Sequence, residues 1–210
     1  MKQELPELVY RQEIDAEFIS SSGALFSNIT TNLCPSGKIY NPNSHEEYYA
    51  GIDLALINDH SVVTIINSIG VVVDYIRFNQ VDMKTAAKKI HTILRKWNYP
   101  MTYLEINAYQ GILELLVDDD CENVYAFITT TKSKKVIIED LIIHFQDSTI
   151  KIPNDKYIIS EFLDFGYVYN SKTRNISYKA QKNSHDDFVM ATAIAFNAKK
   201  KLGNFACAWL

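Results

Sequence analysis

YYAGIDLALINDHSVVTII, residues 48–66, holds two apolar runs that acidic residues interrupt. The first run, 48–56, has the composition of a buried strand, but it contains Asp53. The second run, 61–67, is rich in β-branched residues and predicts another strand. Asp59 lies between the two runs. Because an unpaired charge in apolar surroundings is costly, Asp53 needs a compensating partner.

Strand and helix patterns alternate along the rest of the chain. A third strand is predicted at 70–79 after a tight turn, and a helix at 83–97 after the N-cap residue Asp82. The remaining predicted elements are strands at 101–106 and 123–129, helices at 109–117, 136–145, 157–164 and 186–201, and a hairpin that pairs 167–169 with 175–179.

Three consecutive strands followed by alternating helices and strands predict an α/β fold. We expect a central mixed sheet with three leading antiparallel strands and helices on both faces. This order resembles the ribonuclease-H-like fold, in which the first and fourth strands are neighbours at the sheet centre. Asp53 and Glu105, near the ends of those strands, would then lie close together. The last helix would bring its first residues, Asp186 and Asp187, near them.

The composition changes near residue 47. Residues 1–46 contain a predicted helix at 11–19 and then a segment rich in Ser, Asn, Pro and Gly, which is typical of a linker or arm. Residues 47–210 are predicted to form the globular domain. The chain has no apolar run of eighteen residues that would predict a membrane span. Its three cysteines are far apart, which favours a reducing setting without a disulfide framework.

The net charge of −4 by itself argues mildly against nucleic acid as a partner. The basic residues are nevertheless clustered, and each cluster is either a DNA contact or a solvated helix end or turn. The clusters are Lys132, Lys134 and Lys135; Lys172, Arg174, Lys179 and Lys182; and Lys199, Lys200 and Lys201.

Carboxylates brought together by this topology would repel one another unless a cation lies between them. Mg²⁺ prefers oxygen ligands, and two such ions about 3.5–4 Å apart can promote phosphodiester hydrolysis. Each acid alone has a simpler explanation. A strand carboxylate can be satisfied by backbone donors, and acids such as Asp186 and Asp187 can complement a helix dipole. Their combination with Asp53 and Glu105 favours a metal site.

Three motifs, GIDLALINDHSVV, LEINAYQGIL and SHDDFVMATAIAFN, resemble the nuclease domain of the large terminase subunit of tailed bacteriophages. The earlier segment VYRQEIDAEFISSSGALF resembles the end of the terminase ATPase domain and the linker after it. The resemblance extends from about residue 10 to about residue 200. It implies that residues 1–46 are a linker from a preceding ATPase domain.

The resemblance also implies roles for individual residues. Asp53 matches the acid that bridges two metal ions, and Glu105 matches the second metal-binding acid. The third acid is Asp187 or Asp186, with Asp187 favoured. Asp59 matches a further acid near the second metal.

Other residues of these motifs have supporting roles by resemblance. His185 is either a metal or phosphate contact or a capping or surface residue. Asn107 shapes the loop after the fourth strand. Lys134 or Lys135 matches a basic residue near the site. The predicted DNA contacts are Lys134, Lys135, Arg174, Lys179 and Lys182.

The implied activity is that of a divalent-metal-dependent endonuclease that cuts double-stranded concatemeric phage DNA during genome packaging. It would use two Mg²⁺ or Mn²⁺ ions in the cytoplasm of the infected bacterial host. Its partners would be the ATPase domain, the small terminase subunit and the portal, with no membrane. The chain has seven glycines and no phosphate-binding G-x-x-x-x-G-K-[ST] motif, so we expect no ATP site within it.

Two other functions fit the same features. One is that of another ribonuclease-H-like nuclease, such as a junction resolvase or a transposase. The other is that of a non-catalytic assembly module of the packaging machine, in which the acids are structural.

Overall fold

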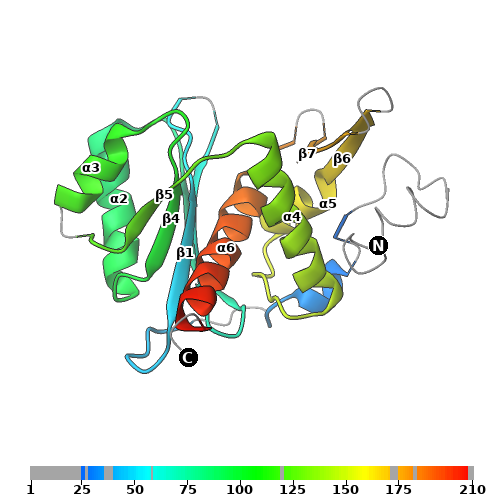
Figure 1. Cartoon of the computed structure of the whole chain (residues 1–210), viewed down its shortest axis with the longest axis horizontal. Helices are drawn as coiled ribbons and strands as arrows, with labels where there is room; N and C mark the ends of the chain where they lie inside the picture. The colour runs from blue at the N-terminus through cyan, green and yellow to red at the C-terminus, as the bar shows by residue number, and fades with distance from the viewer. Residues whose placement is uncertain are drawn as a thin grey trace.

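The computed structural model describes residues 25–26, 28–35, 40–57, 59–118, 121–170, 175–181 and 184–207 of the chain (Figure 1). The helix predicted at 11–19 and two predicted DNA contacts, Arg174 and Lys182, lie outside these residues. None of the helices among the described residues is both long enough and apolar enough to cross a membrane.

The elements follow the predicted order. They are η1 (Ile29–Asn32), β1 (Tyr48–Asp53), β2 (Ser61–Asn67), β3 (Val72–Phe78), α2 (Met83–Lys96), β4 (Met101–Glu105), α3 (Gly111–Asp118), β5 (Val124–Phe127), α4 (Thr131–Gln146), α5 (Lys156–Asp164), β6 (Phe165–Asn170), β7 (Asn175–Ala180) and α6 (Asp187–Cys207). Helix α4 begins five residues earlier than predicted because Thr130 and Ser133 form a capping box.

Five strands form the main sheet in the order β3-β2-β1-β4-β5. Strands β1, β2 and β3 pair antiparallel, whereas β4 pairs parallel with β1 and β5 pairs parallel with β4. The predicted adjacency of the first and fourth strands is therefore confirmed, as is the mixed α/β architecture. Strands β6 and β7 form a separate antiparallel hairpin, which is longer than predicted.

Helices cover both faces of the sheet. Figure 1 shows α2 and α3 against one face, and α6 against the other with α4 beyond it. Two buried clusters correspond to these layers. One contains residues of α2 and α3, and the other contains residues of α4, α5, α6 and the hairpin. Leu25, Phe26 and Ile29, from the segment predicted to be an arm, are buried in the second cluster. The origin of that segment as a linker from an ATPase domain stays a prediction.

Gly51 sets the distance between β1 and α6. A Cβ atom at this position would overlap the carbonyl oxygen of Ala191 and the amide nitrogen of Ala195. The helix backbone therefore packs directly on the strand backbone, which only glycine permits. This contact holds the first turn of α6 near the end of β1.

Candidate metal centre

Asp53 and Glu105 are the last residues of the parallel neighbours β1 and β4. Ile52 pairs with Leu104, so the two acids that follow these residues lie side by side at the carboxyl ends of β1 and β4. Side chains alternate along a strand, and Asp53 shares the face of Gly51, against which α6 packs. The run predicted as a strand to residue 56 ends at Asp53. The acid is thus at the end of a strand rather than in its middle.

The carboxyl groups of Asp53 and Glu105 are in hydrogen-bonding contact. Burial, this contact and the nearby charges of Glu105, Asp187 and Asp186 raise the pKa of Asp53 well above its usual range. The pKa of Asp187 is raised to about 8, first by burial and then by the charge of Asp59. Acids from β1, β4 and α6 therefore lie close together.

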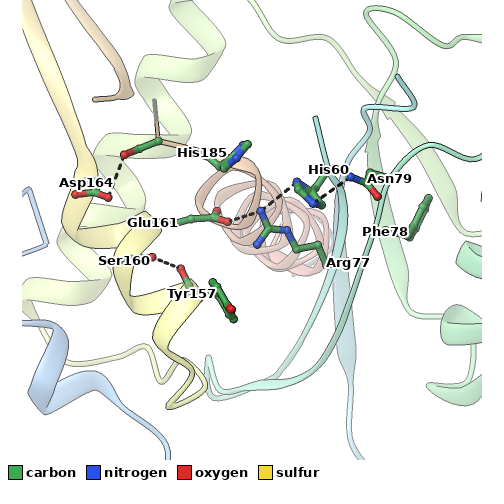
Figure 2. Close-up of a pocket in the computed structure, with 10 residues that line it drawn as sticks. His60, Arg77, Phe78, Asn79, Tyr157, Ser160, Glu161, Asp164 and His185 are labelled. Atoms are coloured by element: carbon green, nitrogen blue, oxygen red, sulfur yellow. Dashed lines mark hydrogen bonds and ion pairs between the residues drawn. The ribbon is translucent and has the colours of Figure 1, made fainter. Parts of the chain in front are cut away.

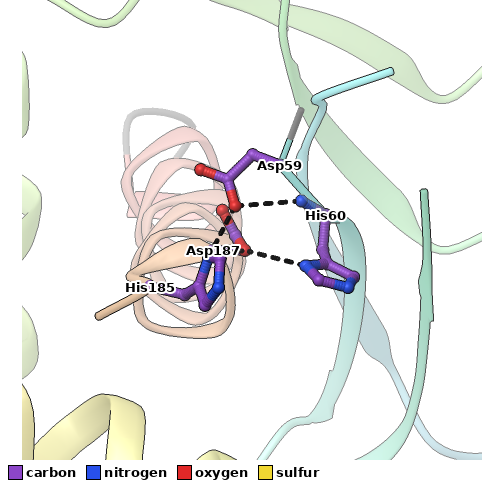
Figure 3. A group of neighbouring side chains, drawn as sticks. All are labelled: Asp59, His60, His185 and Asp187. Atoms are coloured by element: carbon purple, nitrogen blue, oxygen red, sulfur yellow. Dashed lines mark hydrogen bonds and ion pairs between the residues drawn. The ribbon is translucent and has the colours of Figure 1, made fainter. Parts of the chain in front are cut away.

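A second group of side chains adjoins this pair. Asp59, His60, His185 and Asp187 place one potential ligand atom each within 4.8 Å of one another (Figure 3). His185 Nδ1 lies 2.7 Å from Asp59 Oδ1 and 3.8 Å from Asp187 Oδ2, and His60 Nδ1 lies 4.0 Å from Asp187 Oδ2. Two carboxylates and two imidazoles are suitable ligands for a divalent transition metal.

The buried atom Asp187 Oδ2 tests whether this group fits a metal. No hydrogen-bond partner contacts it within the described part of the chain. Nitrogen atoms lie around it at 3.8–4.0 Å, too far for hydrogen bonds. Because ligand atoms lie about 2.0–2.2 Å from a bound Zn²⁺ or Mg²⁺, ligands of one ion are spaced at roughly 3–4 Å. The orphaned oxygen and its surroundings therefore fit a cation.

His60 was not predicted as a site residue. It precedes β2, and its imidazole contacts Arg77 of β3 at 3.1 Å and Asn79 at 3.3 Å. Burial and the charge of Arg77 lower the pKa of His60, which favours the neutral imidazole that metals require. The only signal in the sequence was its position next to Asp59.

The two acids at the start of α6 have different surroundings. Asp186 forms a 2.9 Å ion pair with Lys134 of α4. Asp187 is more buried, with 6% of its side chain exposed. It lies near the pair Asp53 and Glu105 and also belongs to the group with Asp59 and the two histidines. This geometry favours Asp187 as the metal ligand. It also brings Lys134 to the site through Asp186.

The other predicted residues lie around this centre. Asn107 joins the loops after β4 and β5, because its side chain donates to Thr129 O at 2.6 Å and accepts from Thr129 N at 2.9 Å. Lys135 lies 3.8 Å from Glu139, and Lys179 is exposed on β7. A cavity of about 390 Å³ extends between the start of α4, including Lys134 and Lys135, and strand β7. The roles of all these residues in metal or DNA binding stay predictions.

A larger cavity of about 670 Å³ adjoins the histidines (Figure 2). Its wall includes Arg77 of β3 and Glu161 of α5, which are 3.4 Å apart. Neither residue was predicted to be functional. A single acid in a short amphipathic helix carries no signal that it will be buried, and Glu161 is buried where α5 packs against α6 and Arg77 lies beside it.

Comparison with known proteins places this geometry in context. No family model matches the sequence. The terminase large subunit of Thermus virus P23-45 is 25% identical to the chain over 209 residues, a match that covers 92% of the chain and 41% of the relative. The chain therefore spans about two fifths of the length of that relative.

Solved structures show the same fold. The large terminase nuclease of the thermophilic phage G20c with bound magnesium matches with a TM-score of 0.74 at 19% identity, over 83% of this chain and 96% of that one. That nuclease is also known with bound cobalt and with bound zinc. The nuclease domain of the large terminase of Thermus phage P74-26 matches with a TM-score of 0.72 at 20% identity, over 82% and 94% of the two chains. The fold is the ribonuclease-H-like fold of these nucleases, as the order of elements predicted.

Proposed function

Because the chain is a homologue of phage terminase large subunits and has the fold of their nuclease domain, we propose that it is a divalent-metal-dependent endodeoxyribonuclease. It cuts double-stranded concatemeric DNA during genome packaging. The observation that carries this proposal is the convergence of Asp53, Glu105 and Asp187 from β1, β4 and α6 around the same point. Repulsion among these acids gives the centre a strong preference for cations.

Two positions for ions follow from the ligand chemistry. Asp53, Glu105 and Asp187 would hold the first ion. Asp59, Asp187, His60 and His185 hold the second. When bound, two Mg²⁺ or Mn²⁺ ions activate the attacking water and stabilise the leaving oxygen.

The chain's own basic groups support the same chemistry. Lys134 neutralises Asp186, so that this acid adds less repulsion to the centre. Lys135 borders the cavity beside the hairpin and Lys179 lies next to it, and both contact DNA phosphates. Arg174 and Lys182, which lie outside the described residues, are proposed as further phosphate contacts. Such contacts are independent of base sequence and weaken with salt.

The proposed setting is a larger packaging machine. The relative is more than twice as long as the chain. We infer that the nuclease acts together with an ATPase domain, the small terminase subunit and the portal, in the cytoplasm of the infected bacterium. Its acidic net charge of −4 is consistent with weak DNA binding by the chain alone.

Plasmid cleavage tests the proposal. The chain is incubated with supercoiled DNA in Mg²⁺, in Mn²⁺ or in EDTA, beside the variants Asp53→Asn and Asp74→Asn. Asp74 of β3 pairs with Lys96 of α2 and is a matched control outside the centre. We expect metal-dependent cleavage that Asp53→Asn abolishes and Asp74→Asn retains. Equal cleavage by wild type and Asp53→Asn, or cleavage in EDTA, contradicts the proposal.

A further inference from the structure

Glu161 holds the start of α6 from a neighbouring helix. Its side chain is buried, and its Oε2 accepts a hydrogen bond of 2.8 Å from the backbone nitrogen of Phe188. The first backbone N–H groups of a helix have no acceptor within the helix. Glu161 supplies such an acceptor to Phe188, the residue immediately after Asp187. This hydrogen bond therefore limits where the backbone that carries Asp187 can lie.

Helix α5 makes two more contacts with the segment that leads into α6. The hydroxyl of Ser184 donates to Asp164 Oδ2 at 3.0 Å, and the backbone nitrogen of Gln181 donates to Asp164 O at 2.9 Å. Contacts from α5 thus lie on both sides of His185 and Asp187. This helix forms the support on which the second ligand group is built.

Arg77 lies between this support and the candidate ligands. Its Nη2 is 3.4 Å from Glu161 Oε1 and 3.1 Å from His60 Nδ1 (Figure 2). The same atom is 4.0 Å from Asp187 Oδ2. Arginine stays charged and can only donate hydrogen bonds. The guanidinium therefore donates to the lone pair of His60 Nδ1 and faces the oxygen of Asp187 that a cation would use.

We propose that Glu161 and Arg77 together set the affinity of the site for the second ion, Glu161 by positioning its ligands and Arg77 by competing with the ion. This role rests on the proposed function and adds to it what controls the affinity for the second ion. Glu161 fixes the first turn of α6 and draws the guanidinium of Arg77 toward α5. Arg77 competes with the incoming cation for His60 and Asp187, and the charge of Glu161 limits this competition.

The two substitutions have opposite predicted effects. Glu161→Gln keeps the shape and an acceptor for Phe188 but removes the charge that attracts Arg77. The guanidinium then moves onto Asp187 and weakens metal binding. Arg77→Met removes the competitor at similar volume, frees His60 Nδ1 and strengthens binding. If Glu161 had only a structural role, Glu161→Gln would change the stability of the fold, and the two substitutions would not have opposite effects on metal binding.

Mn²⁺ titration calorimetry on the full chain tests the pair. The proteins are wild type, Glu161→Gln, Arg77→Met, the double variant and the control Glu139→Gln. Glu139 is a partly buried acid of α4 that accepts a hydrogen bond from Tyr178, outside the ligand group. We expect Glu161→Gln to weaken one of two binding events by about 10–100-fold, the range found for groups that orient metal ligands. The affinity of the other binding event stays unchanged, and so do both affinities of the control variant.

The decisive comparison is the double variant. We expect Arg77→Met to restore most of the affinity that Glu161→Gln loses, and on its own to tighten the weaker event. Unchanged binding by Glu161→Gln, or weaker binding by Arg77→Met, overturns the inference. If Glu161→Gln fails to fold, the direction of the Arg77→Met effect alone decides. Absence of any Mn²⁺ binding by the wild-type chain refutes the proposed function itself, so the two failures are distinguishable.

Discussion

Gly51 of β1 lies so close to Ala191 of α6 that no Cβ atom fits between the two backbones. This contact connects the packing of the core to the chemistry of the site. Asp53 lies two residues after Gly51 on the same face of the sheet, and Asp187 lies one helical turn before Ala191. The separation of strand and helix therefore sets the separation of the two acids.

Gly51→Ala is predicted to damage both stability and metal binding. Overpacking in a close-packed core typically costs about 1–3 kcal/mol, and here the new methyl group meets backbone atoms that cannot rotate away. Urea unfolding of the metal-free chain measures the loss of stability, and calorimetry measures the loss of Mn²⁺ affinity. Gly166→Ala is the control, because nothing lies within 4 Å of its added Cβ. Equal stability of the two variants would contradict the predicted role of the close contact.

The stability of the metal-free chain is predicted to fall as the pH rises. Burial and the charge of Asp59 raise the pKa of Asp187 in the folded chain to about 8 from its ordinary value of 3.8. Between these values the folded state binds more protons than the unfolded state, so the free energy of unfolding decreases with increasing pH. Asp53 acts in the same direction, because its pKa is also raised.

Added metal reverses this loss by replacing the protons. The rise in melting temperature caused by Mg²⁺ or Mn²⁺ is therefore predicted to be larger at pH 8 than at pH 5.5. Thermal melts with and without metal at both pH values measure it. Asp187→Asn is predicted to flatten the pH dependence of the metal-free chain. A metal effect that is equal at both pH values, or larger at pH 5.5, would argue against a carboxylate centre.

Asp187→Asn is predicted to reduce cleavage far more than Asp186→Asn. Asp187 is buried among the candidate ligands, whereas Asp186 pairs with Lys134. We expect Asp186→Asn to lower the cleavage rate by about 10–100-fold or less, as for a group outside the ligand shell. Asp187→Asn should lower the rate beyond that range. Single-turnover cleavage at saturating Mn²⁺ compares them, and the reverse order would identify Asp186 as the ligand.

Lys135→Ala and Lys179→Ala are predicted to weaken DNA binding and its dependence on salt. Each lost phosphate contact should reduce the slope of log K against log salt by about 0.9. Fluorescence anisotropy with a short duplex in EDTA measures the slope without cleavage. Lys88→Ala, which changes an exposed lysine of α2 on the opposite side of the sheet, serves as the control. Identical slopes for all three variants would exclude the two lysines from the DNA interface.

The central part of the fold was predictable because few arrangements satisfy the order of elements. Three leading strands and a crossover helix place β1 beside β4, and this adjacency brings Asp53 to Glu105. The capping box at Thr130 and the early end of β1 were missed. Apolar periodicity locates the middle of an element better than its ends.

The surroundings of the acids were less predictable, since they depend on tertiary contacts. Gly51 in an apolar run signals a close approach, but the run does not tell which element approaches. His60 and Arg77 meet only through the pairing of β2 and β3, and Glu161 reaches Phe188 only through the packing of α5 on α6. Arg77 and Glu161 lie outside the three motifs that carry the resemblance, and His60 lies inside one of them but has no role assigned by it.

Anomalous diffraction from crystals of the chain soaked in Mn²⁺ would locate the ions directly. We predict one peak bounded by Asp53, Glu105 and Asp187, and a second bounded by Asp59, Asp187 and the histidines. Asp187 Oδ2, which has no hydrogen-bond partner within the described residues, would become a ligand. Absence of Mn²⁺ from this centre under conditions where the chain cleaves DNA would contradict the proposed metal-dependent nuclease.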